Sequence, residues 1–205
     1  MTWASRVPTI AAGSVTVQPE PAKPYLSDAE RALLLALARD ALEAAVRRRP
    51  ARAIPGDHAG RLGSPGACFV TLQAFGQLRG CIGSLEARLP LSEATCDMAA
   101  AAALRDPRFM PVSESELPHV RLSLSVLTPL ERIADPAQVR VGEHGLVISR
   151  AERRGVLLPQ VATENGWDRE TFLDRTCVKA GLLPGAWREP GTNIDVFRAE
   201  VFGED

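Results

Sequence analysis

The sequence predicts an α+β fold rather than a regular strand–helix alternation of the Rossmann type. Apolar residues recur at helical spacing between residues 27 and 50. Between residues 120 and 127 they alternate strictly with polar residues, which is typical of a half-buried strand. Along the chain the predicted elements follow the order helix, strands, helix, strands, helix, strand, and this order favours an α+β architecture.

The first predicted helix spans "SDAERALLLALARDALEAAVRRRP". Ser27 and Glu30 have the spacing of a capping box, in which each side chain bonds the backbone N–H of the other residue. The arginines at 47–49 complement the helix dipole at its C-terminus, and Pro50 stops the helix. We interpret these arginines as a charged helix end rather than a nucleic-acid patch. Residues 1–25 are rich in Pro, Ala, Ser and Thr without a period, and we predict a flexible tail.

Two strand pairs and two further helices follow the loop "RAIPGDHAGRLGSPG". The strands "ACFVTLQ" and "QLRGCIGS" are joined by a short turn at Phe75 and Gly76. The helix "LSEATCDMAAAAALRD" ends before Pro107. The strands "HGLVISR" and "RRGVLLP" precede a third helix, which Asp168 caps and Gly181 follows. "NIDVFRAEVF" is the closing strand.

Composition excludes several classes of function. The chain has 205 residues, of which 45% are hydrophobic, enough for one domain or two tightly joined lobes. The net charge of −1 disfavours nucleic acid and an acidic membrane surface as partners. No apolar stretch is long enough to cross a bilayer, and the first residues lack the apolar core of a signal peptide. We therefore expect a cytoplasmic protein with reduced thiols.

The hexapeptide "LRGCIG", residues 78–83, is the first candidate for a site. In an extended strand Cys81 shares a face with Arg79 and Gly83, while the side with Leu78 and Ile82 is the natural core face. A guanidinium close to the thiol would favour the thiolate, and the flanking glycines let a ligand or another backbone approach. The alternative is a small, inert cysteine that serves packing.

Other polar residues could complete a site around this thiol. A thiol nucleophile needs a base, and His144 in "GEHGL" is the best-placed histidine. In "RDPRF", Arg105 and Arg108 either brace the turn at Asp106 or present two guanidiniums to a carboxylate or phosphate. Gln160 lies just past the end of a predicted strand, where polar groups often face a cleft.

The remaining cysteines, Cys68, Cys96 and Cys177, lie in apolar surroundings, and we interpret them as packing residues. The sequence has no Cys-x-x-Cys pair and its three histidines are scattered, so we predict no metal site. It also lacks a phosphate loop, a Gly-x-Ser-x-Gly elbow and a His-Glu-x-x-His motif. We predict no cofactor.

Taken in order, several blocks resemble the AMMECR domain family, whose bacterial and archaeal members are called AmmeMemoRadiSam system protein A. They include "GQLRGCIGSLEARLPL", "AAALRDPRFMPVSESELP", "LSLSVLTPLERI" and "GEHGLVISRAERRGVLLPQVATENGWDRETFLDRTCVKAGLLPGAW". The resemblance runs from about residue 27 to 202, and "LRGCIG" is the hallmark hexapeptide of the family. It places an AMMECR-type domain at residues 26–205, with the tail outside it.

This resemblance implies two similar strand-and-helix units that share one curved, barrel-like sheet, with a cleft between a larger and a smaller lobe. It also implies two partners, a Memo-type protein similar to extradiol dioxygenases and a radical S-adenosylmethionine protein. The residues that fall on the family pattern are Arg79, Gly80, Cys81, Gly83, Asp106, Arg108, Phe109, His144, Gly145, Pro159 and Gln160.

Two functions stay open at this point. In the first, the protein is an enzyme in which Cys81 is the nucleophile, Arg79 lowers its pKa and His144 is the base. Gln160 and the "RDPRF" arginines would then orient an anionic or amide-bearing substrate. In the second, the protein is a non-catalytic module that binds a small molecule or peptide and serves the Memo-type and radical proteins. Replacing Cys81 by Ser or Ala would then leave binding intact.

Overall fold

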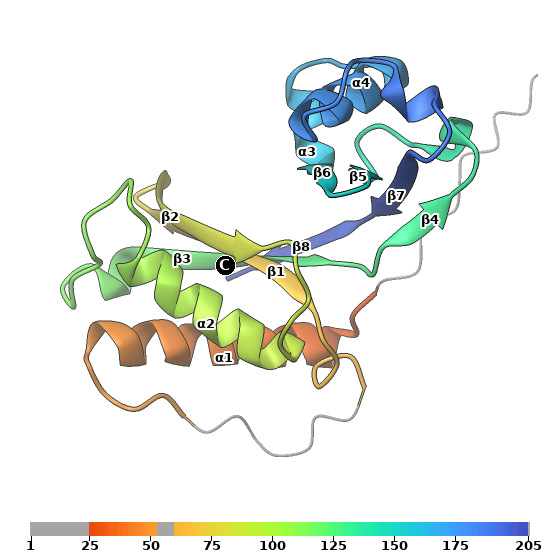
Figure 1. Cartoon of the computed structure of the whole chain (residues 1–205). Helices are drawn as coiled ribbons and strands as arrows, with labels where there is room; N and C mark the ends of the chain where they lie inside the picture. Colours follow the sequence, from red (N-terminus) through yellow and green to blue (C-terminus); the bar gives the residue numbers. More distant parts are fainter. Residues whose placement is uncertain (1–24, 53–59, 205) are drawn as a thin grey trace, which may run out of the picture.

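A computed structural model describes residues 25–52 and 60–204 (Figure 1). The predicted tail up to residue 24 and the middle of the loop predicted after the first helix lie outside the described residues. The described chain forms two lobes, each built on a four-stranded antiparallel sheet with helices on one face. The predicted α+β class is confirmed.

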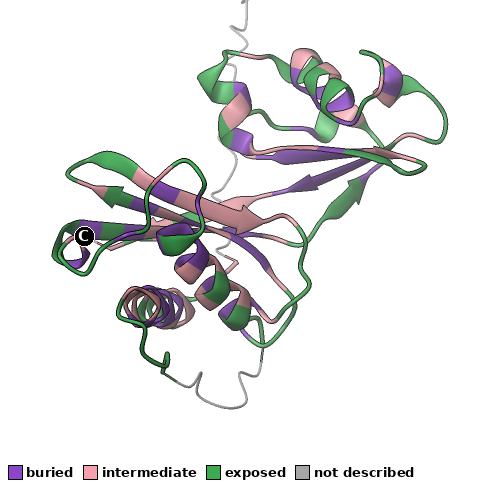
Figure 2. Cartoon of the chain, turned by 60° about the vertical axis from the view of Figure 1, so that its left-hand side comes forward, coloured by how far each residue is buried: buried purple, intermediate pink, exposed green. Residues whose placement is uncertain are grey.

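The first lobe holds the sheet with strand order β2-β1-β3-β8, and two long helices cover one face of it (Figures 1 and 2). Figure 2 shows the buried side of the second of these helices turned toward the sheet. The elements of the first lobe are α1 (Asp28–Val46), β1 (Ala67–Ala74), β2 (Gln77–Ser84), α2 (Leu91–Leu104), β3 (Val120–Leu127) and β8 (Ala199–Gly203).

The second lobe holds the sheet with strand order β4-β7-β5-β6, and two shorter helices lie against it. No helix in either lobe, over the residues described, is long and apolar enough to cross a membrane. The elements of the second lobe are β4 (Glu131–Ile133), β5 (Gly145–Arg150), β6 (Arg153–Leu157), α3 (Pro159–Glu164), α4 (Arg169–Lys179) and β7 (Asn193–Phe197).

The two sheets are assembled in the same way. Each has a hairpin (β1 and β2, or β5 and β6), a helix after the hairpin, and a strand (β3 or β7) that pairs with the first hairpin strand. Each third strand then continues into the edge of the other sheet, β3 into β4 and β7 into β8 (Figure 1). The lobes therefore exchange edge strands, and two similar strand-and-helix units are present.

The expectation of one shared, barrel-like sheet is wrong. The two long strand runs break where they cross between the lobes, at residues 128–130 and at Arg198. There the N–H of Thr128 donates to the carbonyl of Arg198 over 2.9 Å, and the N–H of Arg198 donates to Thr128 Oγ1 over 2.8 Å. On either side of this point the two runs stay paired with each other, as β3 with β8 and as β4 with β7. Each pair belongs to a different four-stranded sheet, so the described strands form two sheets and do not close a barrel.

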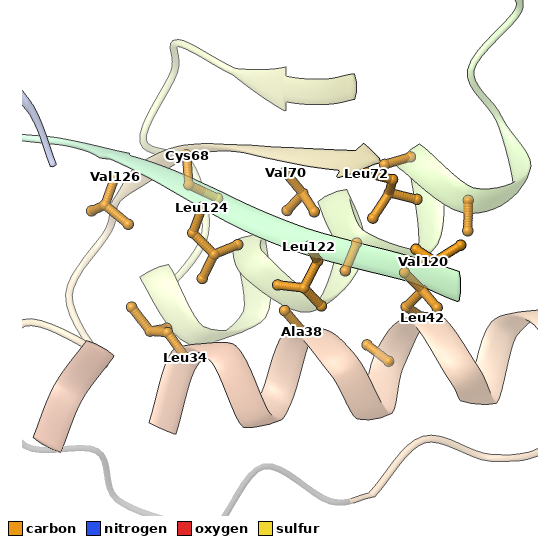
Figure 3. Packing of buried hydrophobic residues seen from close by; sticks show 14 of the residues in the cluster. Leu34, Ala38, Leu42, Cys68, Val70, Leu72, Val120, Leu122, Leu124 and Val126 are labelled. Carbon is orange, nitrogen blue, oxygen red and sulfur yellow. The ribbon is translucent and has the colours of Figure 1, made fainter. Parts of the chain in front are cut away.

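Each lobe has its own core. In the first, the inward residues of β1 and β3 pack on the apolar side of α1, as Figure 3 shows for Val70, Leu122 and Leu34. In the second, Phe172 of α4 lies fully buried against the sheet. A third cluster, made by the buried residues Ala67, Leu127, Val147 and Phe197, joins the lobes.

Most local predictions are confirmed. The capping box of Ser27 and Glu30 is complete, and Asp168 caps α4 through the N–H of Thr171. Phe75 and Gly76 both have positive φ, as a two-residue hairpin turn requires. Other details differ. The first helix ends at Val46, so the arginines at 47–49 follow it, and the short strand β4 and the short helix α3 were not predicted. The closing strand is divided into β7 and β8.

Candidate functional site

The hexapeptide lies in β2, and its middle residues alternate between two environments. A Cβ on Gly80 would stand 2.3 Å from the carbonyl oxygen of Ala102 in α2, so this face of the strand touches the helix backbone. Ile82 packs against the same core. Cys81 lies on the opposite face and is half-buried. The predicted orientation holds for this part of the strand.

The prediction fails for Leu78, which is 45% exposed instead of facing the core. The cause is a bulge in the hairpin. Leu72 pairs with Gly80 and Gln73 pairs with Leu78, which leaves Arg79 as the extra residue. One extra residue reverses the alternation, so the first part of the strand turns its apolar side chain outward.

The bulge also determines which residue of β1 lies beside the thiol of Cys81. A two-residue turn at 75–76 without a bulge would place Thr71 opposite Gly80. The observed register instead pairs Thr71 with Cys81. The hydroxyl of Thr71 donates to the Cys81 sulfur over 3.3 Å.

The backbone of Cys81 is held by the segment that follows α2. Its N–H donates to Asp106 Oδ2 over 2.8 Å, and Arg108 donates to its carbonyl over 3.1 Å. Arg108 also bonds both oxygens of Asp106, and these bonds hold the pKa of that carboxyl well below its usual range. The Arg108 guanidinium lies 5.4 Å from the ring centre of Phe109. These contacts support the bracing interpretation of "RDPRF".

Two other arginines of the predicted site are paired with acidic residues. Arg105 bonds Asp97 over 2.6 Å at the surface of α2. Arg79 donates to Glu116 over 2.7 Å, and this bond, with others, lowers the pKa of Glu116 to about 2. The charge of Arg79 is therefore balanced by Glu116, and it does not stand as an isolated cation beside Cys81.

His144 lies in the second lobe, just before β5. It is 7% exposed, and its Nδ1 accepts a hydrogen bond from the N–H of Arg140 over 3.4 Å. Burial, together with the nearby charge of Arg198, lowers its pKa, so the ring is neutral at neutral pH. It does not line the cavity that contains Cys81. No described contact supports its assignment as a base for this thiol.

A cavity of about 220 Å³ separates the outer face of the first sheet from the start of α3, and Cys81 and Gln160 both line it. The structure thus brings together two predicted site residues from different lobes. Gly83 leaves room for Phe69 in the wall of this cavity, because a Cβ there would stand 2.3 Å from the ring of Phe69 and would displace it. The lining residues are Phe69, Thr71, Cys81, Ser125, Leu158, Gln160, Val161, Glu164 and Ala199.

Sequence reasoning missed several of these residues. Ser125 could have been found, because strict alternation in β3 places it opposite the buried Leu124 and Val126. Thr71 required knowledge of the bulge. Glu164 required α3, a helix of only six residues, which the pattern did not predict.

Comparison with known proteins places the chain in a family. The AMMECR1 family model matches residues 35–202. The chain belongs to the AMMECR1 family. A protein from Methanothermobacter thermautotrophicus is 44% identical over 186 residues, which cover 88% of this chain and 97% of that protein. One from Thermofilum pendens is 41% identical over 195 residues, covering 87% and 92%.

A solved structure in the same family has the same fold. The crystal structure of an uncharacterized protein from Pyrococcus horikoshii matches with a TM-score of 0.72 and 38% sequence identity. The match covers 88% of this chain and 94% of that one. The names of these relatives state no activity.

Proposed function

We propose that the cavity beside Cys81 is a ligand site, and that its thiol is reactive toward what binds there. The observation that carries the proposal is that contacts hold both the sulfur and the backbone of Cys81. Its sulfur accepts a hydrogen bond from Thr71 at the cavity wall, and its backbone is held on both sides by Asp106 and Arg108. Such positioning from two segments, β1 and the segment after α2, is typical of a functional side chain.

The other cysteines lie in different surroundings. Cys68 and Cys177 are buried, and burial raises the pKa of both thiols. Cys96 is partly exposed, but burial of its sulfur raises its pKa to about 11. These thiols are protonated at neutral pH, and a protonated thiol is a poor nucleophile.

The cavity lining suggests the class of ligand. Gln160 can both donate and accept, while Glu164 places a carboxylate at the same wall. A negative carboxylate disfavours an anionic ligand and suits an amide or amine. At about 220 Å³, the cavity is smaller than the roughly 300–1,000 Å³ of sites for drug-sized ligands. We therefore propose a small amide-bearing molecule, or one end of a peptide.

The rate of iodoacetamide alkylation against pH tests this proposal. The Thr71→Val variant should slow alkylation of Cys81 at pH 7 by about three- to tenfold, because the thiolate loses a hydroxyl donor. Ser123→Ala is the matched control. Ser123 lies on the same face of the sheet as Thr71 and pairs with it, but it belongs to β3, on the opposite side of β1 from Cys81. Equal rates for wild type and Thr71→Val would refute a thiol activated by this contact.

A second candidate function is a binding module for a Memo-type protein and a radical S-adenosylmethionine protein. It is favoured by large apolar side chains that are exposed on the first lobe. They are Phe75 and Leu78 in the hairpin of β1 and β2 and Met110 after α2, which are 79%, 45% and 81% exposed. A pull-down with the purified Memo-type protein distinguishes the candidates. Capture that survives Cys81→Ala but is lost in Leu78→Ser favours the module, and capture lost with Cys81→Ala favours the thiol site.

A further inference from the structure

The second lobe repeats the construction of the candidate site. In β2, Gly80 lets the backbone of α2 approach closely, with Ala102 O 2.3 Å from a built Cβ. In β6, Gly155 does the same for α4, with Ala180 N 2.3 Å from a built Cβ. Both glycines lie in the second strand of a hairpin. Each faces a long helix that comes later in the chain, α2 as the first helix after β2 and α4 as the second helix after β6, behind the short α3. They therefore mark equivalent positions.

Aligning Gly80 with Gly155 pairs the other residues of the first hairpin with their counterparts in the second. Cys81 comes after Gly80, and Val156 comes after Gly155. Across the hairpin, Thr71 pairs with Cys81 and Val147 pairs with Val156. The counterpart of the Cys81 cavity should therefore lie over Val147 and Val156.

A cavity of about 380 Å³ lies at that place. Its floor is formed by Val147, Val156 and Phe197 of the second sheet. The segment after β2, residues 85–88, covers it, just as the segment after β6 covers the Cys81 cavity. Each cavity is also lined at the start of an exchanged edge strand. Leu130, just before β4, lines this cavity, and Ala199, the first residue of β8, lines the Cys81 cavity. The two cavities are equivalent in position but differ in lining.

At these two positions the larger cavity is apolar where the other is polar, because Val147 and Val156 replace Thr71 and Cys81. Its charged residues are Arg88, Glu86 and Arg154. Arg88 and Glu86 form an ion pair with each other. Within the described part of the chain, Arg154 has no ion pair or hydrogen bond through its guanidinium. Its counterpart Arg79 is neutralised by Glu116, so one positive charge at this cavity lacks a protein partner.

We propose that this second cavity binds a small organic anion with an apolar body, such as a medium-chain carboxylate. The apolar body would lie over Val147, Val156 and Phe197, and the carboxylate would bond Arg154 at the mouth. A guanidinium matches a carboxylate with two parallel hydrogen bonds. The volume falls within the roughly 300–1,000 Å³ typical of small-molecule sites.

Calorimetric titration of the full chain with octanoate tests the proposal, with octanol as the neutral probe. Octanoate should bind, and Arg154→Gln should weaken it at least about fivefold through loss of the charged partner. Arg153→Gln is the matched control, because Arg153 donates to the carbonyl of Gly181 at 2.8 Å and lies outside the cavity. It should leave the affinity unchanged.

Alkylation of Cys81 in the presence of saturating octanoate separates the two cavities. The alkylation rate should not change, because the anion occupies the other side of the lobe junction. The proposal is overturned if octanoate does not bind, if octanol binds equally well, or if Arg154→Gln binds octanoate like wild type. Protection of Cys81 by octanoate would also overturn it, since the anion would then sit in the first cavity.

Discussion

Cys81 shows how far the chemistry of one residue depends on its partners. The thiol meets Thr71 from the neighbouring strand, while Asp106 and Arg108 hold the backbone from the segment after α2. The face of the strand on which Cys81 lies could be predicted from alternation alone. Its contacts could not, because they depend on a bulge and on a loop that starts some twenty-five residues later.

Arg79 illustrates the limit of local reasoning. In sequence it lies two residues from Cys81, and a direct electrostatic effect on the thiol was expected. In the structure it bonds Glu116, which is 37 residues away along the chain. Only the fold can show that the nearest cation to a thiol in sequence already has an acidic partner.

The ion pair of Arg79 and Glu116 predicts a pH dependence of stability. Glu116 has a folded pKa of about 2, against about 4.3 in an unfolded chain. Because the folded pKa is the lower one, the pair stabilises the protein above about pH 4.3, and this contribution is lost as the pH falls toward 2. The side chain of Glu116 is 32% exposed, so we expect about 1 kcal/mol after solvent screening.

Urea unfolding of wild type and Glu116→Gln at several pH values measures this contribution. The difference between the two free energies of unfolding should be largest at pH 5 and above and should shrink between pH 4 and pH 2. A difference that stays constant over this range would contradict the assignment of the low pKa to Glu116.

At the scale of elements, two close strand–helix contacts shape both lobes. The backbone atoms that a side chain at Gly80 or Gly155 would meet belong to α2 and to the last turn and C-cap of α4, so they cannot move away as a flexible side chain could. A methyl group at either position would push the helix off the sheet.

We expect Gly80→Ala and Gly155→Ala each to lower the free energy of unfolding by about 1–3 kcal/mol or more, as overpacking does. Gln77→Ala, on the exposed start of β2, is the control and should change it by less than about 0.5 kcal/mol. Chemical denaturation gives the values. A Gly80→Ala protein as stable as the control would mean that α2 does not approach the strand as described.

The first residues of α1 and α4 could be predicted best, since Ser27 and Asp168 carry their capping chemistry in the sequence. We expect Ser27→Ala to lower the free energy of unfolding in urea by about 1 kcal/mol. A change below about 0.3 kcal/mol would mean that the capping box contributes little.

The six-residue helix α3 could not be predicted, because two turns starting at Pro159 are too short to establish a period. That omission concealed the role of Glu164 in the cavity.

At the scale of the whole molecule, the exchange of edge strands ties the lobes together. β4 and β8 each belong to one lobe by pairing and continue a strand of the other. The cluster around Phe197 fills the junction, and the two cavities lie on either side of it. The composition and the order of elements predicted the α+β class. The division into two sheets depends on pairings between distant strands, such as β3 with β8, which no local pattern encodes.

This connection predicts that the two lobes unfold together. The helices of the first lobe, 19 and 14 residues long, dominate the far-ultraviolet circular dichroism. Trp167 and Trp187 of the second lobe dominate the fluorescence of a Trp3→Phe variant. Urea transitions followed by the two signals should coincide. Separate transitions would show that the exchanged strands do not couple the lobes.

Competitive alkylation of all four cysteines tests the proposal that Cys81 is the reactive thiol of a ligand cavity. The native protein is treated with a limiting amount of iodoacetamide at pH 7, and peptide mass spectrometry measures modification at each cysteine. We expect Cys81 to be modified well before Cys68, Cys96 and Cys177. Modification of Cys96 at the same rate as Cys81, or faster, would contradict it.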